Sequence, residues 1–264
     1  INRNGTKIMI SPNAVNGMKG GIAVAYLSQI VSKFNSTILV ERFPQSAVMS
    51  NSFIQTDSLF QFNKELNYQV FMVPALMVMV LTLLCGFLPA VSIVFEKEIG
   101  TMEQINVSPV PKIVFILAKL IPFWLIGFIV ITIGFGVAWG VYGLVPNGHF
   151  YTIYIFAFIF ILGISGLGLV ISNYAQTMQQ AVFIVFFFMM IFIMMSGLYT
   201  PIDSMPNWGQ WIAAFDPLKY FMSVMRSVYL KGSDTIHLLK DLCILCMFAV
   251  FFNAWAIISY RKSQ

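Results

Sequence analysis

The sequence predicts an α-helical polytopic membrane protein with about five spans, preceded by a small α/β extracytoplasmic fragment. The composition is the first reason, because 59% of the 264 residues are hydrophobic and 9% are charged, whereas a soluble domain has roughly 25% charged residues. The distribution of charge is the second reason. No Asp, Glu, Lys or Arg occurs between Lys119 and Asp203, and a run of that length holds several segments that can each cross hydrocarbon.

Residues 1–65 read as a partial extracytoplasmic α/β domain. Lys7–Ile10 and Thr37–Phe43 are candidate strands, and an apolar stripe between them has helical spacing: Ile22, Tyr26, Ile30 and Phe34. A strand, a helix and a strand in this order resemble a βαβ unit. Two strands and one helix bury too little surface to fold alone, so we expect further chain before Ile1.

Residues 66–264 are predicted to form the transmembrane domain. The first span covers about 66–95, where Pro74 and Pro89 are helix breaks that a membrane span tolerates. The other spans follow from the remaining apolar runs: about 113–142, 150–171, 181–198 and 238–260. A tight turn at 144–149 and an uncharged polar segment at 173–180 connect the middle spans.

Basic residues at the span ends predict the orientation. Placing Arg261 and Lys262 in the cytoplasm also places Lys97, Lys112 and Lys119 there, because an even number of crossings separates them. The N-terminal fragment is then outside. The loop from Tyr199 to His237 would be outside as well, although it carries three basic residues of its own.

The segment between the first two spans predicts a short helix at about 100–108. Thr101 and Gln104 have the spacing of a capping box, and Gly100 allows a sharp turn before them. Ser108-Pro109 suits the cap and first position of the next helix. Two interpretations stay open: a lever that docks on a soluble partner, or ordinary interfacial charges.

The loop at 202–232 predicts a helical hairpin. Asp216 can cap a helix that begins at Pro217, and Gly232 can end it. Its apolar face consists of Leu218, Phe221, Met222, Met225 and Tyr229. Trp208 and Trp211 suit a membrane interface. An amphipathic connector that lies on the membrane is the alternative.

Glycine pairs and one lysine are the remaining features of the spans. Gly136-x-x-x-Gly140 and Gly163-x-x-Gly166-x-Gly168 are predicted to be packing sites within the subunit. Lys119, near a span end, is expected to extend to the lipid headgroups.

Several site classes are not supported. The three cysteines lie in apolar runs, and Cys243 and Cys246 have no second pair to complete a metal site, so no metal site is predicted. The basic residues form no patch, so no nucleic-acid partner is expected.

One motif resembles a known family. Glu96-Lys97-Glu98-x-Gly100-Thr101-Met102-Glu103-Gln104, followed by Ser108-Pro109, resembles the signature of ABC-2 type transporter membrane subunits. The resemblance extends from Phe62 to Lys262 through three further motifs: Phe62-Asn63-x-x-Leu66-x-Tyr68-x-x-Phe71-x-Val73-Pro74, Gly197-x-x-x-Pro201-x-x-x-Met205-Pro206, and Asp216-Pro217-x-x-Tyr220-x-x-x-x-x-Arg226.

The resemblance implies two functional regions. The first is a coupling helix that docks on a separate ATP-binding subunit, with these contact residues: Glu96, Glu98, Gly100, Thr101, Glu103, Gln104 and Pro109. The second is an outer gate hairpin that dips into the outer leaflet, with Pro201, Pro206, Trp208, Asp216, Pro217 and Arg226. Members have six spans, and the drug-exporter-like branch has an extracytoplasmic domain between the first two, so the first span is expected to be missing here.

The resemblance also implies a function: the permease subunit of an ATP-driven exporter in the bacterial inner membrane, moving a hydrophobic or amphipathic substrate. The expected partners are an ABC ATPase subunit, a second permease subunit, membrane lipid and a periplasmic adaptor. No Gly-x-x-x-x-Gly-Lys-Ser/Thr pattern occurs, so we do not expect this chain to be an enzyme or to bind a cofactor. ATP and Mg are expected to bind to the partner ATPase subunit.

Two other functions stay as alternatives. An ion-coupled secondary transporter, or another polytopic protein without an ATPase, would normally place charges in mid-membrane, and the spans between Leu120 and Leu198 have none. An intramembrane enzyme would need a reactive cluster at membrane depth, whereas His149 and His237 fall in loops.

Overall fold

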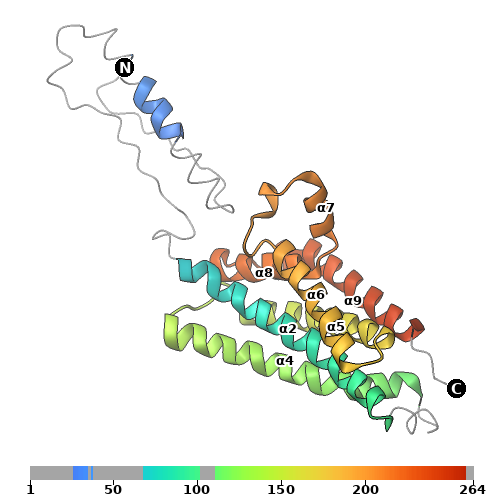
Figure 1. Ribbon diagram of the computed structural model, residues 1–264. Helices are drawn as coiled ribbons and strands as arrows, with labels where there is room; N and C mark the ends of the chain where they lie inside the picture. Colours follow the sequence, from blue (N-terminus) through green and yellow to red (C-terminus); the bar gives the residue numbers. More distant parts are fainter. Residues whose placement is uncertain (1–25, 35–36, 38–67, 102–110, 260–264) are drawn as a thin grey trace, which may run out of the picture. The chain divides into compact units, whose positions relative to one another are not determined.

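The computed structural model describes residues 26–34, 37, 68–101 and 111–259 (Figure 1). The chain forms two compact units, Ile1–Leu66 and Asn67–Gln264. The second unit holds every helix discussed below except the short one at 26–34.

The described part of the first unit is helical. Residues 26–34 form the helix that the apolar stripe predicts, and Tyr26, Ile30 and Phe34 are exposed on it. Lys7–Ile10 and 38–43 lie outside the described residues. Thr37 was expected in a strand but is helical, and its hydroxyl donates to the carbonyl of Lys33 one turn earlier at 2.9 Å. The described residues therefore contain no strand and do not support the α/β fragment.

The second unit contains five helices long and apolar enough to cross a membrane, as the sequence predicts. They are α2 (Tyr68–Glu98), α4 (Lys112–Tyr142), α5 (Phe150–Tyr174), α6 (Met178–Met195) and α9 (Leu239–Ser259). Figure 1 shows them side by side, and α5 makes its largest contacts with α9 and α2.

The helix that precedes the charged segment is longer than expected. α2 runs through both Pro74 and Pro89 and ends at Glu98 rather than at 95. Neighbouring helices in a membrane bundle compensate for the backbone bond that each proline removes. Glu96, Lys97 and Glu98 therefore belong to the last turn of a span and not to a loop.

The next helix begins later than Ser108-Pro109 would place it. α4 starts at Lys112, after Pro111 in an extended conformation. Pro111 is thus the cap residue of α4 and Lys112 its first helical residue. The expectation that Pro109 opens this helix is wrong, and 102–110 lie outside the described residues.

The polar connection predicted at 173–180 shrinks to Ala175–Thr177. α5 continues through Asn173 because this side chain finds partners on α9, donating to the Ala256 carbonyl at 2.9 Å. Thr177 then caps α6 by accepting from the amide of Gln180 at 3.2 Å.

The core is centred on α5. The Phe160 ring stacks on Phe221 of the hairpin with centroids 4.6 Å apart. Close approach of the helices depends on glycine, since a Cβ atom at Gly168 would lie 2.5 Å from the Gly86 carbonyl oxygen. The predicted packing at Gly163, Gly166 and Gly168 is confirmed. For Gly136 and Gly140 it is wrong within the described part of the chain, where a Cβ atom at either position would meet no neighbouring helix within 4 Å.

The segment after α6 folds into four short helices: η1 (Ile202–Ser204), α7 (Asn207–Ala214), α8 (Pro217–Lys231) and η2 (Thr235–Leu238). α8 buries the whole predicted apolar face, including Leu218, Phe221 and Met225, against α2, α5 and α9. It is thus part of the bundle core and not a connector on its surface. α7 instead leaves Trp208 and Trp211 exposed.

Candidate functional site

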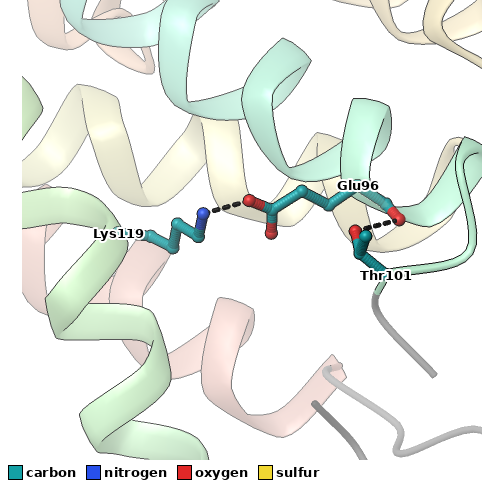
Figure 2. A network of polar contacts seen from close by, with 3 residues as sticks. All are labelled: Glu96, Thr101 and Lys119. Atoms are coloured by element: carbon teal, nitrogen blue, oxygen red, sulfur yellow. Dashed lines mark hydrogen bonds and ion pairs between the residues drawn. The ribbon is translucent and has the colours of Figure 1, made fainter. Parts of the chain in front are cut away.

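Three consecutive charged residues, Glu96, Lys97 and Glu98, form the last turn of α2; we call them the charged triplet. Successive side chains on a helix point about 100° apart, so each of the three faces a different neighbour. Figure 2 shows the first contact, in which Lys119 of α4 reaches Glu96 and its Nζ atom pairs with Oε1. The two side chains are 29% and 19% exposed. Lys119 was expected to extend to headgroups, but its ammonium group ends on this carboxylate.

Lys97 contacts the C-terminal end of α5. Its Nζ atom donates to the carbonyl of Ser172, and also to those of Asn173 and Ala175 at 3.3 and 3.5 Å. The last carbonyls of a helix lack intrahelical partners, and a cation is favoured beside them. Lys97 therefore acts as a C-terminal cap supplied by another helix.

Glu98 contacts the N-terminal end of α6. Its Oε2 atom accepts from the amide of Met178, the first residue of α6, at 2.7 Å. The first amides of a helix are unpaired and favour a negative charge. The charged triplet thus connects α2 to α4, α5 and α6.

The chain turns sharply directly after the charged triplet. Gly100 has φ +82°, a conformation that favours glycine, and its amide donates to the Lys97 carbonyl at 3.2 Å. The Thr101 hydroxyl donates to the Glu96 carbonyl at 3.1 Å (Figure 2). Thr101 was expected to form a capping box with Gln104, which lies outside the described residues.

The predicted coupling-helix residues therefore fall into two groups. Glu103, Gln104 and Pro109 lie outside the described residues. Ile99 and Gly100 form the turn and Thr101 after it is helical, while Glu96 and Glu98 each have a partner within this chain. Contact of these residues with an ATPase stays a prediction.

The predicted hairpin residues are brought together only in part. Asp216 caps α8, as predicted, with Oδ1 accepting from the Leu218 amide at 2.8 Å, and Pro217 is the first helical residue. Pro201 and Pro206 precede η1 and α7 without a side-chain cap. Trp208 is exposed on α7.

Asp216 is almost completely buried, with 1% of its surface exposed. Burial raises the pKa of its carboxyl group well above the usual range, whereas the Leu218 amide and the charge of Lys219 act in the opposite direction. Its Oδ2 atom has no hydrogen-bond partner within the described part of the chain.

Arg226 is a residue of α8 that contacts the start of α2 and the segment directly after α6. Its Nη1 atom donates to the Gly197 carbonyl at 3.1 Å, and its guanidinium carbon lies 3.8 Å from the centroid of the Phe71 ring. Nε and Nη2 are buried without a partner among the described residues. The hydrogen bond and the cation–π contact fix α8 to two neighbouring helix ends.

The turn between α4 and α5 holds the other end of α8, which the sequence gave no reason to expect. The amides of Asn147 and Gly148 donate to the carbonyls of Tyr229 and Val228 at 3.3 and 3.1 Å. The Asn147 side chain donates to Leu230 at 3.1 Å. In the sequence, Asn147-Gly148 predicts only a turn. Its role as a cap could not be predicted, because the carbonyls that it binds are some eighty residues away in the chain.

Asn173 is a second contact that the sequence does not reveal. Besides Ala256, its side-chain nitrogen donates to the Ser259 hydroxyl at 2.7 Å. It joins the end of α5 beside Lys97 to the end of α9, so four helices other than α2 meet near the charged triplet.

Five helices able to cross a membrane, a charged helix end at the base of α2 and a hairpin packed into the bundle together define a polytopic α-helical membrane domain. The chain belongs to the ABC-2 family of transporter proteins, whose match covers residues 2–258.

Three relatives illustrate this membership. The probable multidrug ABC transporter permease YbhR of Escherichia coli K12 is 31% identical over 219 residues, covering 83% of this chain and 58% of that protein. The probable multidrug ABC transporter permease YbhS of the same strain is 27% identical over 206 residues, or 75% and 53% of the two chains. The inner membrane transport permease YhhJ, also of that strain, is 24% identical over 188 residues, or 69% and 49%. The chain spans about half the length of these curated relatives.

Proposed function

We propose that this chain is the membrane-spanning part of an ABC exporter subunit, driven by a separate ATP-binding subunit. The observation that carries the proposal is the charged end of α2. There, a helix that crosses the membrane ends in the charged triplet, turns at Gly100 and leads into 102–110, the segment whose sequence resembles a coupling helix. The names of YbhR and YbhS support the same assignment.

The working assembly would contain two permease subunits and two ATPase subunits, with ATP and Mg bound by the ATPase. A periplasmic adaptor is a further expected partner. The charged end would face the cytoplasm of a bacterial cell, because Lys97, Lys112 and Lys119 gather there. The hairpin would then lie on the outer side and the N-terminal fragment outside.

A hydrophobic or amphipathic substrate suits the exposed surface of the bundle. Only one stripe of α6 is buried, and the rest of the helix presents large apolar side chains: Phe183, Phe186, Phe187, Met190 and Met194. Such a surface can contact an acyl chain or a drug ring as well as lipid, whereas it offers no charge for a polar cargo.

The hairpin would act as the outer gate. α8 is joined to its neighbours in its second half by Arg226 and at its end by Asn147 and Gly148. A helix joined at both of these points would move together with the elements that hold it. Replacement of Arg226 by Met should lower substrate-stimulated ATP hydrolysis, while recovery of the ATPase with the chain stays unchanged.

Co-purification tests the central proposal. The full-length subunit, isolated in mild detergent, should bring with it a P-loop ATPase whose hydrolysis rises with lipids or drugs after reconstitution. Glu103→Lys should reduce this association, and Asp234→Lys, the same charge change at the hairpin end, should not. Glu103 is preferable to Glu98 because Glu98 has a partner inside the chain.

Two results would contradict the proposal. The first is recovery of the subunit without any ATPase, unaffected by Glu103→Lys. The second is substrate movement under an ion gradient without ATP, which would favour a secondary transporter.

A further inference from the structure

We infer that the charged triplet is a positioning element, which transmits any displacement of the segment 102–110 to α4, α5 and α6 at the same time. The inference rests on the proposed function, because it assumes that an ATPase moves this segment. It differs from a docking role, in which Glu96 and Glu98 would contact the ATPase directly.

The ion pair between Glu96 and Lys119 joins the two helices on either side of 102–110. Glu96 lies five residues before Thr101, and Lys119 lies two turns into α4. The pair therefore joins the end of the helix before this segment to the helix after it. Since both side chains are largely shielded from solvent, screening by salt is weaker than at an exposed pair.

Lys97 and Glu98 hold the connection between α5 and α6 from both sides. Lys97 binds the carbonyls that end α5, and Glu98 binds the amide that begins α6. Each side chain has the sign of charge that its helix end favours. Because the two residues are adjacent in sequence, neither can move without changing the other contact.

Only Ile99, Gly100 and Thr101 connect the charged triplet to the segment 102–110, and Gly100 and Thr101 are hydrogen-bonded to the last turn of α2. The Thr101 hydroxyl binds the Glu96 carbonyl, and the Gly100 amide binds the Lys97 carbonyl. Gly100 alone adopts a left-handed conformation between them. A shift of Thr101 therefore pulls directly on the turn of α2 that carries all three charges (Figure 2).

A charge exchange separates positioning from docking. In the complete complex of full-length permease and ATPase, Glu96→Lys and Lys119→Glu should each lower substrate-stimulated hydrolysis about tenfold, because each leaves two like charges in contact. The double variant restores an attractive pair and should recover hydrolysis to within about threefold of the starting protein. Co-purification of the ATPase should stay unchanged in all three.

The inference is overturned if the double variant is no better than Glu96→Lys, or if Glu96→Lys alone loses the ATPase. Either result would mean that Glu96 acts by contacting the ATPase and not by pairing with Lys119. If the unaltered complex contains no ATPase, the proposed function fails instead. The thermal midpoints of the same four permeases would then still report whether the pair clamps α2 to α4.

Glu98 provides a second test that does not involve charge reversal. Glu98→Gln keeps an oxygen that can accept from the Met178 amide, whereas Glu98→Ala does not. Glutamine should therefore retain coupling within about threefold and alanine should lose it about tenfold, with the ATPase bound in both. Equal loss in both variants, or loss of the ATPase from either, counts against the inference. Gel filtration in detergent shows whether the alanine variant is folded, and the glutamine variant decides the case if it is not.

Discussion

Two glycine motifs were predicted alike as packing sites but have opposite surroundings: Gly163, Gly166 and Gly168 of α5, and Gly136 and Gly140 of α4. An 18-residue stretch of each helix has a mean hydropathy of 2.5, yet 78% of this stretch is buried in α5 and only 28% in α4. Gly163 and Gly166 lie against Ala249 and Asn253 of α9, and Gly168 lies against Gly86 of α2, whereas Gly136 and Gly140 face open space. Glycine spacing thus indicates where a helix can be approached closely, but not whether this chain supplies the partner.

The difference has a physical origin in the membrane environment. Lipid tails are as apolar as the side chains they contact, so burial of apolar surface does little to bring spans together. Close van der Waals packing and hydrogen bonds between helices do so instead. Gly163, Gly166 and Gly168 of α5 should therefore be costly to enlarge, and Gly136 and Gly140 of α4 should not.

Gly168→Ala should have the largest effect on that comparison. The added Cβ atom would lie 2.5 Å from the Gly86 carbonyl oxygen and 3.6 Å from the Ala90 amide nitrogen, and backbone atoms cannot rotate away. Such overpacking should cost about 3 kcal/mol of unfolding free energy. Thermal unfolding of the purified chain in mild detergent measures the loss, with Gly136→Ala as the matched control. Equal midpoints for the two variants would refute the argument.

Gly166→Ala should have an intermediate effect. Its Cβ atom would lie 2.8 Å from Nδ2 of Asn253, a side chain that can partly move away. Moving it weakens its hydrogen bond to the Leu162 carbonyl, now 2.9 Å long. We expect a loss of about 1–2 kcal/mol, measured by the same unfolding experiment. A loss as large as that of Gly168→Ala would show that the asparagine does not yield.

Asn253→Ala should cost less, about 0.6 kcal/mol, which is typical of a hydrogen bond between membrane helices. It also removes the side chain that Gly166→Ala would displace. The double variant should consequently lose less stability than the sum of the two single losses. Strict additivity would show that the two positions do not interact.

Gly136→Ala and Gly140→Ala should have the smallest effects, within about 0.5 kcal/mol of zero. Nothing in the described chain lies within 4 Å of the added atoms. A marked drop in the unfolding midpoint of the isolated chain would mean that Gly136 or Gly140 is packed after all.

Local signals were sufficient wherever neighbouring residues decide the structure. Apolar run length predicts the five spans, and Asp216-Pro217 and Gly232 correctly mark the ends of α8. Polar residues gave wrong predictions where partners distant in sequence decide the structure. Asn173 extends α5 because α9 is beside it, and Glu96 reads as a loop charge although Lys119 holds it at the end of a span.

The sequence predicted where the candidate site lies in the chain, but it did not predict which residues contact one another there. The triplet's charges and their spacing mark the end of α2, yet no local rule states that Lys97 and Glu98 bind the ends of two other helices. The contacts of α8 with Asn147 and Gly148 were likewise invisible, because they join residues that only the folded bundle brings together.

The short turn at 143–149 has a practical consequence for anyone who labels this protein. By length and exposure it is where an epitope tag or a fluorescent reporter would ordinarily be inserted. Its backbone, however, supplies amides that bind the carbonyls at the end of α8, so an insertion there would remove these contacts. A reporter placed in this turn would therefore alter the end of a helix that is distant from it in sequence.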